Sequence, residues 1–315
     1  MELSQEKLKK IKSLEKQYNV GEAGLYAILY KPFKGLQEDR DIHYTSGKRT
    51  FLDIIKNEHT DGKSQPLLIY IHGGGWISGW RKARRYYCGH WAKEGFVCAN
   101  IGYDYALDAK HPQHIRQIFK GIEYILENAD RYGIDTEQIV IAGESAGAHL
   151  GALVAAVATH KELYDSMDID FKYKDSFKVK ACILMSGIYD PIRSLDTKFK
   201  DMDWFIESLC GRPLNDIKAD DELKRSISPS CYADEKFPPS YIIGSNKDLL
   251  LAESIKFHEE LDSANVENEL FVCSGINGVH AGALACHVGS GKTAVENAKR
   301  FVLNAIKEAE AVQAK

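Results

Sequence analysis

The chain has 315 residues, of which 44% are hydrophobic and 27% are charged, and its 41 basic and 45 acidic residues leave a net charge of −4. No basic stripe is present, which argues against a nucleic-acid partner, and no apolar run of about 18 residues is available to span a bilayer. Segment 1–20 is rich in Lys and Glu and lacks the apolar core of a secretory signal, so we predict a cytoplasmic protein.

Cysteine and histidine spacing gives no sign of a disulfide framework or of a metal site. The seven cysteines are scattered without a C-x-x-C pair, and the eleven histidines include no H-E-x-x-H motif. We therefore expect no metal and no cofactor.

The first 60 residues predict two surface helices and a pair of strands. Leu8, Ile11 and Leu14 recur at helical spacing among charged residues in segment 4–17, and segment 21–30 gives a second short helical pattern. Residues 42–44 and 50–55 then alternate well enough to form two strands around a turn.

From residue 65 the pattern changes to buried strands separated by amphipathic helices. This alternation predicts an α/β fold with a mostly parallel sheet covered on both faces, whose active groups belong at the carboxyl ends of the strands. The predicted strands are 67–71, 96–101, 139–142, 179–185, 241–243 and 269–273, and the predicted helices include 82–94, 115–129, 252–264 and 293–309.

Residues 191–226 do not fit this alternation. They form a charged helical excursion of roughly 35 residues, too long for a plain connection between two elements of an α/β sheet. We interpret the segment as a helical lid insertion over the strand ends, joined by N-terminal cap helices in 1–40, with 41–190 and 227–315 as the core. The alternative is a peripheral surface helix.

The sequence Gly143-Glu144-Ser145-Ala146-Gly147 follows a buried strand and precedes an apolar helix. Strand, sharp turn and helix with small residues around a serine are the layout of the G-x-S-x-G nucleophile elbow. The same pattern also arises by chance as a glycine-rich turn, so residues elsewhere in the chain must decide.

A serine nucleophile needs a base and an orienting carboxylate. Asp248 follows the strand 241–243, and His280 lies in a glycine-rich loop after the strand that ends at residue 273. The chain order of Ser145, Asp248 and His280 is the order expected of an α/β-hydrolase. Asp190 and His287 are the alternatives for the acid and the base.

Acyl transfer also needs donors for an oxyanion. Ala146 offers the N–H after the nucleophile, and the run His72-Gly73-Gly74-Gly75-Trp76 follows the strand 67–71. We expect Gly74 and Gly75 to donate, Gly73 to act as a hinge, and His72 to brace the loop. Trp76 and Trp80 either wall the pocket or belong to the core. We expect Glu144 to be solvated or structurally paired and His149 to be packed under the elbow.

The chain resembles the hormone-sensitive-lipase-like α/β-hydrolases, which include carboxylesterases and acetyl esterases. The resemblance rests on H-G-G-G-W, the Tyr103–Leu107 segment, G-E-S-A-G and the later Asp and His. Segments 145–150 and 186–190 are also similar to the kynurenine formamidase branch. The resemblance covers roughly residues 42–310. It implies Ser145 as nucleophile, His280 as base and acid, and Asp248 as the residue that orients His280. It also implies an α/β-hydrolase fold with a small helical cap.

We therefore predict a serine hydrolase that cleaves short acyl or acetyl esters through an acyl-enzyme, with a small-molecule ester as its partner. One alternative is hydrolysis of an aryl formamide, and another is an inactive small-molecule receptor on the same fold. The glycine-rich segment 289–293 hints at a phosphate loop but has Cys286 where the motif requires glycine, so we assign it to a helix start. The oligomeric state stays open, and a homodimer is one option.

Overall fold

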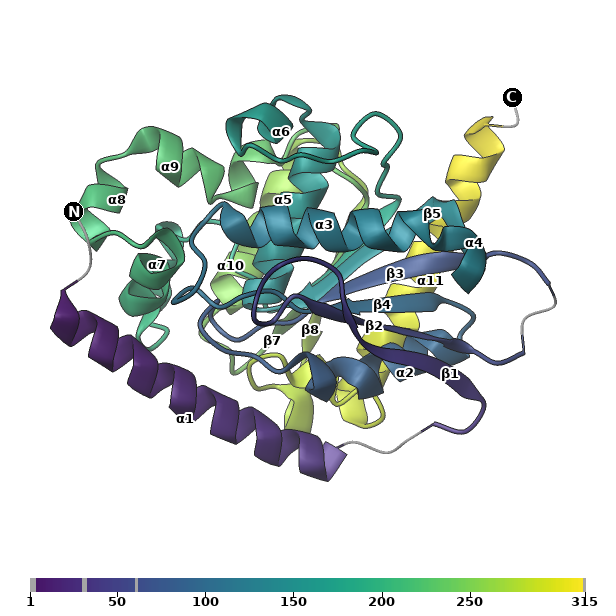
Figure 1. The fold of residues 1–315 in the computed structure, drawn as a ribbon, viewed down its shortest axis with the longest axis horizontal. Coiled ribbons are helices and arrows are strands. Elements are labelled where there is room, and N and C mark those ends of the chain that lie inside the picture. The colour runs from purple at the N-terminus through teal and green to yellow at the C-terminus, as the bar shows by residue number, and fades with distance from the viewer. Residues whose placement is uncertain (1–3, 30–32, 60–61, 314–315) are drawn as a thin grey trace.

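The computed structural model describes residues 4–29, 33–59 and 62–313, in which eight strands form one central sheet (Figure 1). The strand order is β1-β2-β4-β3-β5-β6-β7-β8. β2 is antiparallel to both of its neighbours, whereas the pairs from β4 to β8 are all parallel. The predicted mostly parallel α/β sheet is therefore present. The strands are β1 (Leu36–His43), β2 (Phe51–Asn57), β3 (Gln65–Ile71), β4 (Val97–Ile101), β5 (Ile134–Glu144), β6 (Ala181–Met185), β7 (Ser240–Ser245) and β8 (Asn268–Cys273).

Five helices cover the sheet: α2 (Arg85–Lys93), α3 (Gln113–Glu127), α5 (Ala146–Thr159), α10 (Leu251–Ser263) and α11 (Gly289–Gln313). α2 and α11 share a buried apolar cluster with one face of the strands, and α3, α5 and α10 share another with the opposite face. Because both faces are covered, polar side chains that act on a ligand belong to the loops at the strand ends.

The remaining described helices are short apart from the first. They are α1 (Gln5–Leu29), α4 (Ala129–Tyr132), α6 (Glu162–Ser166), α7 (Met202–Cys210), α8 (Leu214–Lys218) and α9 (Asp221–Ser226). Single 3-10 turns are η1 (Arg81–Arg84), η2 (Arg193–Thr197), η3 (Pro229–Tyr232), η4 (Gly275–Asn277) and η5 (Gly282–Leu284). The predicted excursion 191–226 thus consists of η2, α7, α8 and α9. No helix in the described ranges is long and apolar enough to cross a membrane.

The prediction of two separate N-terminal helices is wrong, because α1 is continuous through residues 5–29. Ile11 and Leu14 are buried, and Tyr18 meets Phe205 of α7 at 5.8 Å between ring centroids. An ion pair of 2.5 Å joins Lys7 Nζ to Glu207 Oε1, also on α7. These contacts with the rest of the chain favour one docked helix, since packing contributes more to helix stability than local propensity. α1 consequently lies beside α7, as Figure 1 shows.

Candidate active site

Ser145 occupies the tight turn between β5 and α5. Its φ of 53° and ψ of −123° lie in a region that non-glycine residues rarely adopt. The turn requires small neighbours, because a Cβ on Gly147 would lie 2.1 Å from the carbonyl oxygen of Ile71. A Cβ on Gly143 would lie 2.6 Å from the carbonyl carbon of Gly147. The elbow geometry predicted for residues 143–147 is present, and Ser145 stands at the N-terminus of α5.

The loop after β3 brings two backbone donors beside this serine. Gly74 has a φ of 120° and Gly75 a φ of 59°, and a Cβ on Gly74 would lie 2.3 Å from the carbonyl oxygen of Ser78. Within the described part of the chain, the N–H groups of Gly74 and Gly75 donate to no other group. Ala146 is the first residue of α5, so its N–H has no acceptor inside the helix. These three amides are available to a ligand oxygen.

A buried carboxylate holds this loop against the elbow. Glu144, only 1% exposed, accepts the N–H of Gly73 at 2.7 Å through Oε1. The Nε and Nη2 atoms of Arg84 each lie 2.6 Å from the same oxygen, and the Tyr70 hydroxyl donates to Oε2. Burial and the Glu144 charge raise the pKa of Tyr70, which keeps its hydroxyl protonated as a donor. Glu144 is therefore a structural partner, which was one of the two roles expected for it.

Aromatic and imidazole side chains brace the same loop from beneath. His72 Nδ1 donates to the carbonyl oxygen of Gly73 at 2.8 Å, as expected. Trp76 is fully buried, and its Nε1 donates to His149 Nδ1 at 3.1 Å. His149 Nε2 donates to the carbonyl oxygen of Ile227 at 2.8 Å, and burial lowers the pKa of His149 to about 4. Trp76 is therefore a core residue, and Trp80 lines a different pocket, so neither tryptophan walls the serine's cavity.

The predicted acid and base lie together at the ends of β7 and β8. His280 Nδ1 lies 2.9 Å from Asp248 Oδ2, and Asp248 Oδ1 accepts the N–H of Leu250 at 3.0 Å. Burial alone would raise the pKa of Asp248, but the hydrogen bond and charge of His280 outweigh it and leave that pKa below its ordinary value. Asp248 is consequently a carboxylate that fixes the tautomer of His280, leaving Nε2 as the acceptor.

Ser186 belongs to this cluster and was given no role in the sequence analysis. It is the first residue after β6, is fully buried, and has a φ of 47°. Its Oγ accepts the N–H of Ala281 at 3.2 Å, and its hydrogen bond to Asp248 contributes to the lowered pKa of that carboxyl. Its place at a strand end was the only sequence signal that could have identified it.

Asp190 and His287, the alternatives for the acid and the base, make their contacts away from Ser145. Asp190 Oδ1 accepts the N–H groups of Ile192 and Arg193 at 2.9 and 3.1 Å, in the turn that precedes η2. The ring of His287 packs at 5.4 Å from Tyr86 and lines a separate surface pocket. The geometry therefore favours Asp248 and His280. Segment 289–293 begins α11, as the sequence analysis assigned it.

Ser145 and His280 line one cavity of about 420 Å³. Among the described residues no hydrogen bond joins the serine hydroxyl to His280, and such bonds often tighten only when a substrate is bound. Gly73, Gly74 and Gly75 border the same space. The rest of the lining is mainly apolar and comes chiefly from α1, the loop after β6, the 191–226 segment and the loops after β7 and β8. These apolar residues include Tyr18, Ile188, Phe199, Met202, Phe205, Leu250, Ile276, Val279 and Leu284.

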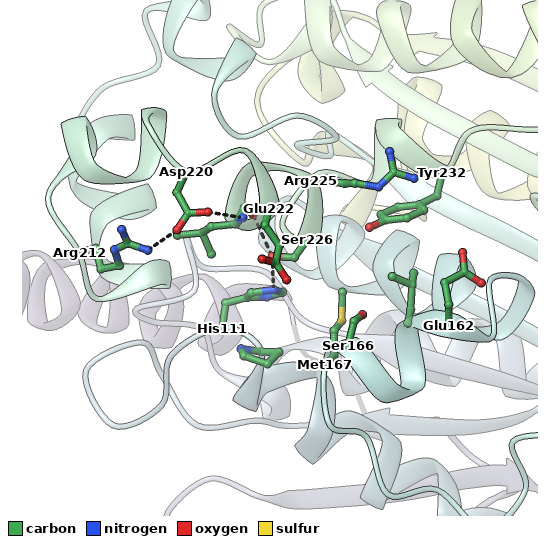
Figure 2. Close-up of a pocket in the computed structure, with 13 residues that line it drawn as sticks. His111, Glu162, Ser166, Met167, Arg212, Asp220, Glu222, Arg225, Ser226 and Tyr232 are labelled. Atoms are coloured by element: carbon green, nitrogen blue, oxygen red, sulfur yellow. Dashed lines mark hydrogen bonds and ion pairs between the residues drawn. The ribbon is translucent and has the colours of Figure 1, made fainter.

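A second pocket, of about 440 Å³, lies between α6 and α9 and is more polar (Figure 2). Its charged groups are partly paired, since Arg212 Nη1 contacts Asp220 Oδ2 at 2.7 Å and the Arg225 guanidinium lies over the ring of Tyr232. His111 Nε2 lies 3.2 Å from Ser226 Oγ. None of the predicted catalytic or oxyanion residues lines this pocket.

Solved structures with the same fold include two esterases. The crystal structure of esterase B from Lactobacillus rhamnosis matches with a TM-score of 0.85 at 20% identity, covering 98% of each chain. A bacterial heroin esterase matches with a TM-score of 0.73 at 24% identity, covering 95% of this chain and 92% of the other. The eight-stranded sheet, its helical layers and the elbow therefore define the α/β-hydrolase fold, as predicted.

Sequence comparison identifies the family. The model of the BD-FAE family matches residues 52–261, well over half of the chain, so this chain belongs to the BD-FAE family. Esterase LipQ of Mycobacterium tuberculosis is 29% identical over 229 residues, which cover 71% of this chain and 52% of the relative. Esterase LipC of the same organism is 27% identical, with 67% and 51% covered. The chain thus spans about half the length of these curated relatives. The resemblance to hormone-sensitive-lipase-like α/β-hydrolases is confirmed.

Proposed function

We propose that this protein hydrolyses carboxylic esters through an acyl-enzyme. Ser145 Oγ attacks the ester carbonyl while His280 Nε2 takes its proton, and His280 then gives that proton to the leaving alcohol. Asp248 holds the imidazole and stabilises its charged form. The amides of Gly74, Gly75 and Ala146 receive the oxyanion, and each well-aimed donor is worth about 3 kcal/mol in the transition state. Water then attacks the acyl-enzyme, with His280 again as base and then acid, and the carboxylic acid is released from Ser145.

One observation carries this proposal. His280 is hydrogen-bonded to Asp248 and lines the same cavity as Ser145. Gly74 and Gly75, whose amides are unpaired, line that cavity too. A nucleophile, a base with an orienting carboxylate, and free donors in one apolar space meet the requirements of acyl transfer. The esterase names of the relatives agree with this chemistry.

Replacement of the nucleophile tests the proposal. We expect Ser145→Ala to reduce hydrolysis of a short chromogenic acyl ester roughly 10⁴-fold or more, with little change in melting temperature. Ser263→Ala, an exposed serine on α10, is the matched control and should retain wild-type turnover. A Ser145→Ala enzyme with wild-type turnover would exclude this mechanism. A wild-type protein that resists labelling by a fluorophosphonate would instead support the receptor alternative.

We also propose that α1 and segment 191–226 act together as the cap of the cavity and set the acyl preference. Tyr18 of α1 and Phe205 of α7 line the cavity and contact each other. Phe199 lies 5.2 Å from His280 between ring centroids, and the Phe205 ring would be 2.8 Å from a Cβ at Gly75. Aromatic rings over both the base and the oxyanion loop favour a small apolar acyl group.

The same aromatic wall is the observation that keeps aryl formamide hydrolysis as a second candidate, because a ring of the substrate can stack on Phe199 or Phe205. Turnover of N-formylkynurenine measured beside that of a short acetyl ester separates the two candidates. A kcat/KM at least tenfold higher for the formamide would favour the second. A cytoplasmic location and a homodimer stay predictions from the sequence.

A further inference from the structure

A dipeptide at the end of β6 lies between the predicted nucleophile and the predicted acid. β6 is paired with β5, which ends beside Ser145, and with β7, which leads to Asp248. The carbonyl oxygen of Met185, the last residue of β6, accepts the N–H of Ser145 at 2.8 Å. The N–H of Ser186 donates to the carbonyl oxygen of Ile243 on β7 at 2.7 Å. The peptide unit that joins Met185 to Ser186 is therefore fixed on both of its sides.

The side chain of Ser186 reaches both the acid and the loop of the base. Its Oγ accepts the N–H of Ala281, the residue after His280, at 3.2 Å. Asp248 also forms a side-chain hydrogen bond with Ser186. A hydroxyl can accept one bond and donate another, and an ionised carboxylate only accepts, so the hydroxyl proton belongs to the bond with Asp248. Ser186 thus joins the acid to the backbone beside the base by a path that is separate from the bond between His280 and Asp248.

The predicted base lies on a loop that has little burial of its own. Val279 is 53% exposed and the side chain of His280 is 30% exposed, whereas Ser186 is fully buried. Ala281 has a φ of 52°, which non-glycine residues rarely adopt, so contacts must hold the backbone there. The bond from Ala281 to Ser186 ties this backbone to the central sheet.

Ser186 itself has a conformation that glycine would adopt more easily. Its φ of 47° lies in the left-handed region, where the Cβ of a serine is unfavourable. Ser186 is not among the described residues that line the cavity of Ser145. Its hydroxyl can therefore act on the reaction only through the acid and the base loop that it contacts.

We propose that Ser186 is a positioning residue for acyl transfer. Its hydroxyl holds the Asp248 carboxylate and the backbone beside His280 at one fixed separation, which keeps the imidazole aimed for proton transfer. Proton transfer is sensitive to such geometry, because a displacement of about 1 Å can reduce a rate about a hundredfold. The inference rests on the proposed ester hydrolysis, and it adds a side chain that neither attacks the ester nor carries its proton.

Two substitutions that remove the hydroxyl test this role in the full chain. Ser186→Ala keeps a Cβ at the positive φ, whereas Ser186→Gly relieves that strain, so the second variant stays informative if the first folds poorly. We expect kcat/KM for nitrophenyl acetate to fall about tenfold in both variants.

A second ester separates positioning from a simple loss of folded protein. The alkoxide of ethyl acetate needs a proton from His280 as it leaves, whereas nitrophenolate leaves without one. We therefore expect kcat/KM for ethyl acetate to fall about a hundredfold in the same two variants. A smaller folded fraction would instead lower both values by the same factor.

Ser245→Ala is the matched control. Ser245 is buried at the end of the neighbouring strand β7, and its Oγ has no hydrogen-bond partner within the described ranges. This variant should keep both activities, and melting temperatures check that all variants fold. Wild-type kcat/KM in both Ser186 variants, or equal losses for the two esters, would overturn the positioning role while leaving ester hydrolysis intact. A wild-type protein that hydrolyses neither ester would overturn the proposed function and this inference together.

Discussion

Two glycine-containing loops border the candidate site, and they are stabilised in opposite ways. The loop after β3 is buried, and Gly73 and Arg84 share one carboxylate oxygen of Glu144. The loop after β8 is partly exposed and uncharged, with Ile276 at 76% exposure, and Asn277 crosslinks it by donating to the carbonyl oxygen of Gly282 at 2.9 Å.

The difference matches what each loop would do. Oxyanion donors help only if they are already aimed before the reaction, which a buried ion pair enforces. A general base moves a proton and needs only its orientation to be fixed, which Asp248 and the bond from Ala281 to Ser186 supply. The second loop is thus free to expose aliphatic residues around the cavity.

The largest expected effect comes from removing the carboxylate of the buried loop. Glu144→Ala leaves the Arg84 charge buried without its partner and the Gly73 N–H without an acceptor, so we expect a loss of about 3–5 kcal/mol in the free energy of unfolding. Urea denaturation measures it. Glu94→Ala breaks the exposed pair with Lys299 and should cost less than about 1 kcal/mol. Similar losses for the two variants would contradict the role given to Glu144.

A second prediction compares one glycine from each loop. Gly74→Ala combines a φ of 120° with a Cβ only 2.3 Å from a backbone oxygen, and we expect a loss of about 3 kcal/mol together with most of the esterase activity. Gly275→Ala has a φ of 63° with no atom within 4 Å of the new Cβ, so about 1 kcal/mol of backbone strain is expected. Thermal unfolding and ester turnover of both variants check this. Equal stability losses would mean that the two loops are equally constrained.

The smallest predicted effect concerns Asp248 and pH. Its pKa is lower in the folded protein than in the unfolded chain, so its stabilising contribution is present above the unfolded value of about 3.9 and is lost as the pH falls through the folded value. At pH 6 we expect Asp248→Asn to be less stable than wild type by about 1–2 kcal/mol. This gap should close toward pH 3. Urea denaturation of both proteins at pH 6 and pH 3 measures this difference in stability. A difference that does not change with pH would contradict the lowered pKa of Asp248.

Local signals explain what could be predicted from the sequence. The elbow around Ser145 depends on small residues at adjacent positions, and the strand ends that carry Asp248 and His280 follow from apolar runs that end in turns. Each of these features spans only a few residues, so each can be recognised in the printed sequence. The family resemblance then agreed with the same residues.

Long-range pairing explains what could not be predicted. Arg84 meets Glu144 across 60 residues, and Ser186 meets Ala281 across 95, so neither pair has a signature in local spacing. Separate helical patterns in segments 4–17 and 21–30 predicted two helices, but α1 is continuous, and its long-range contacts through Ile11, Leu14 and Tyr18 were not visible in local spacing. The direction of Trp76 was open for the same reason, because its partner, His149, lies on another element.

His149 has a consequence for engineering the proposed cap. One neutral imidazole receives the indole N–H of Trp76, in the loop after β3, and donates to the carbonyl oxygen of Ile227, immediately beyond α9. The donor loop and the far end of the 191–226 segment are thus joined through a single ring. A chimera that replaces this segment with another cap must therefore reproduce the position of that carbonyl, or the transplant will disturb the donors even though it touches none of them.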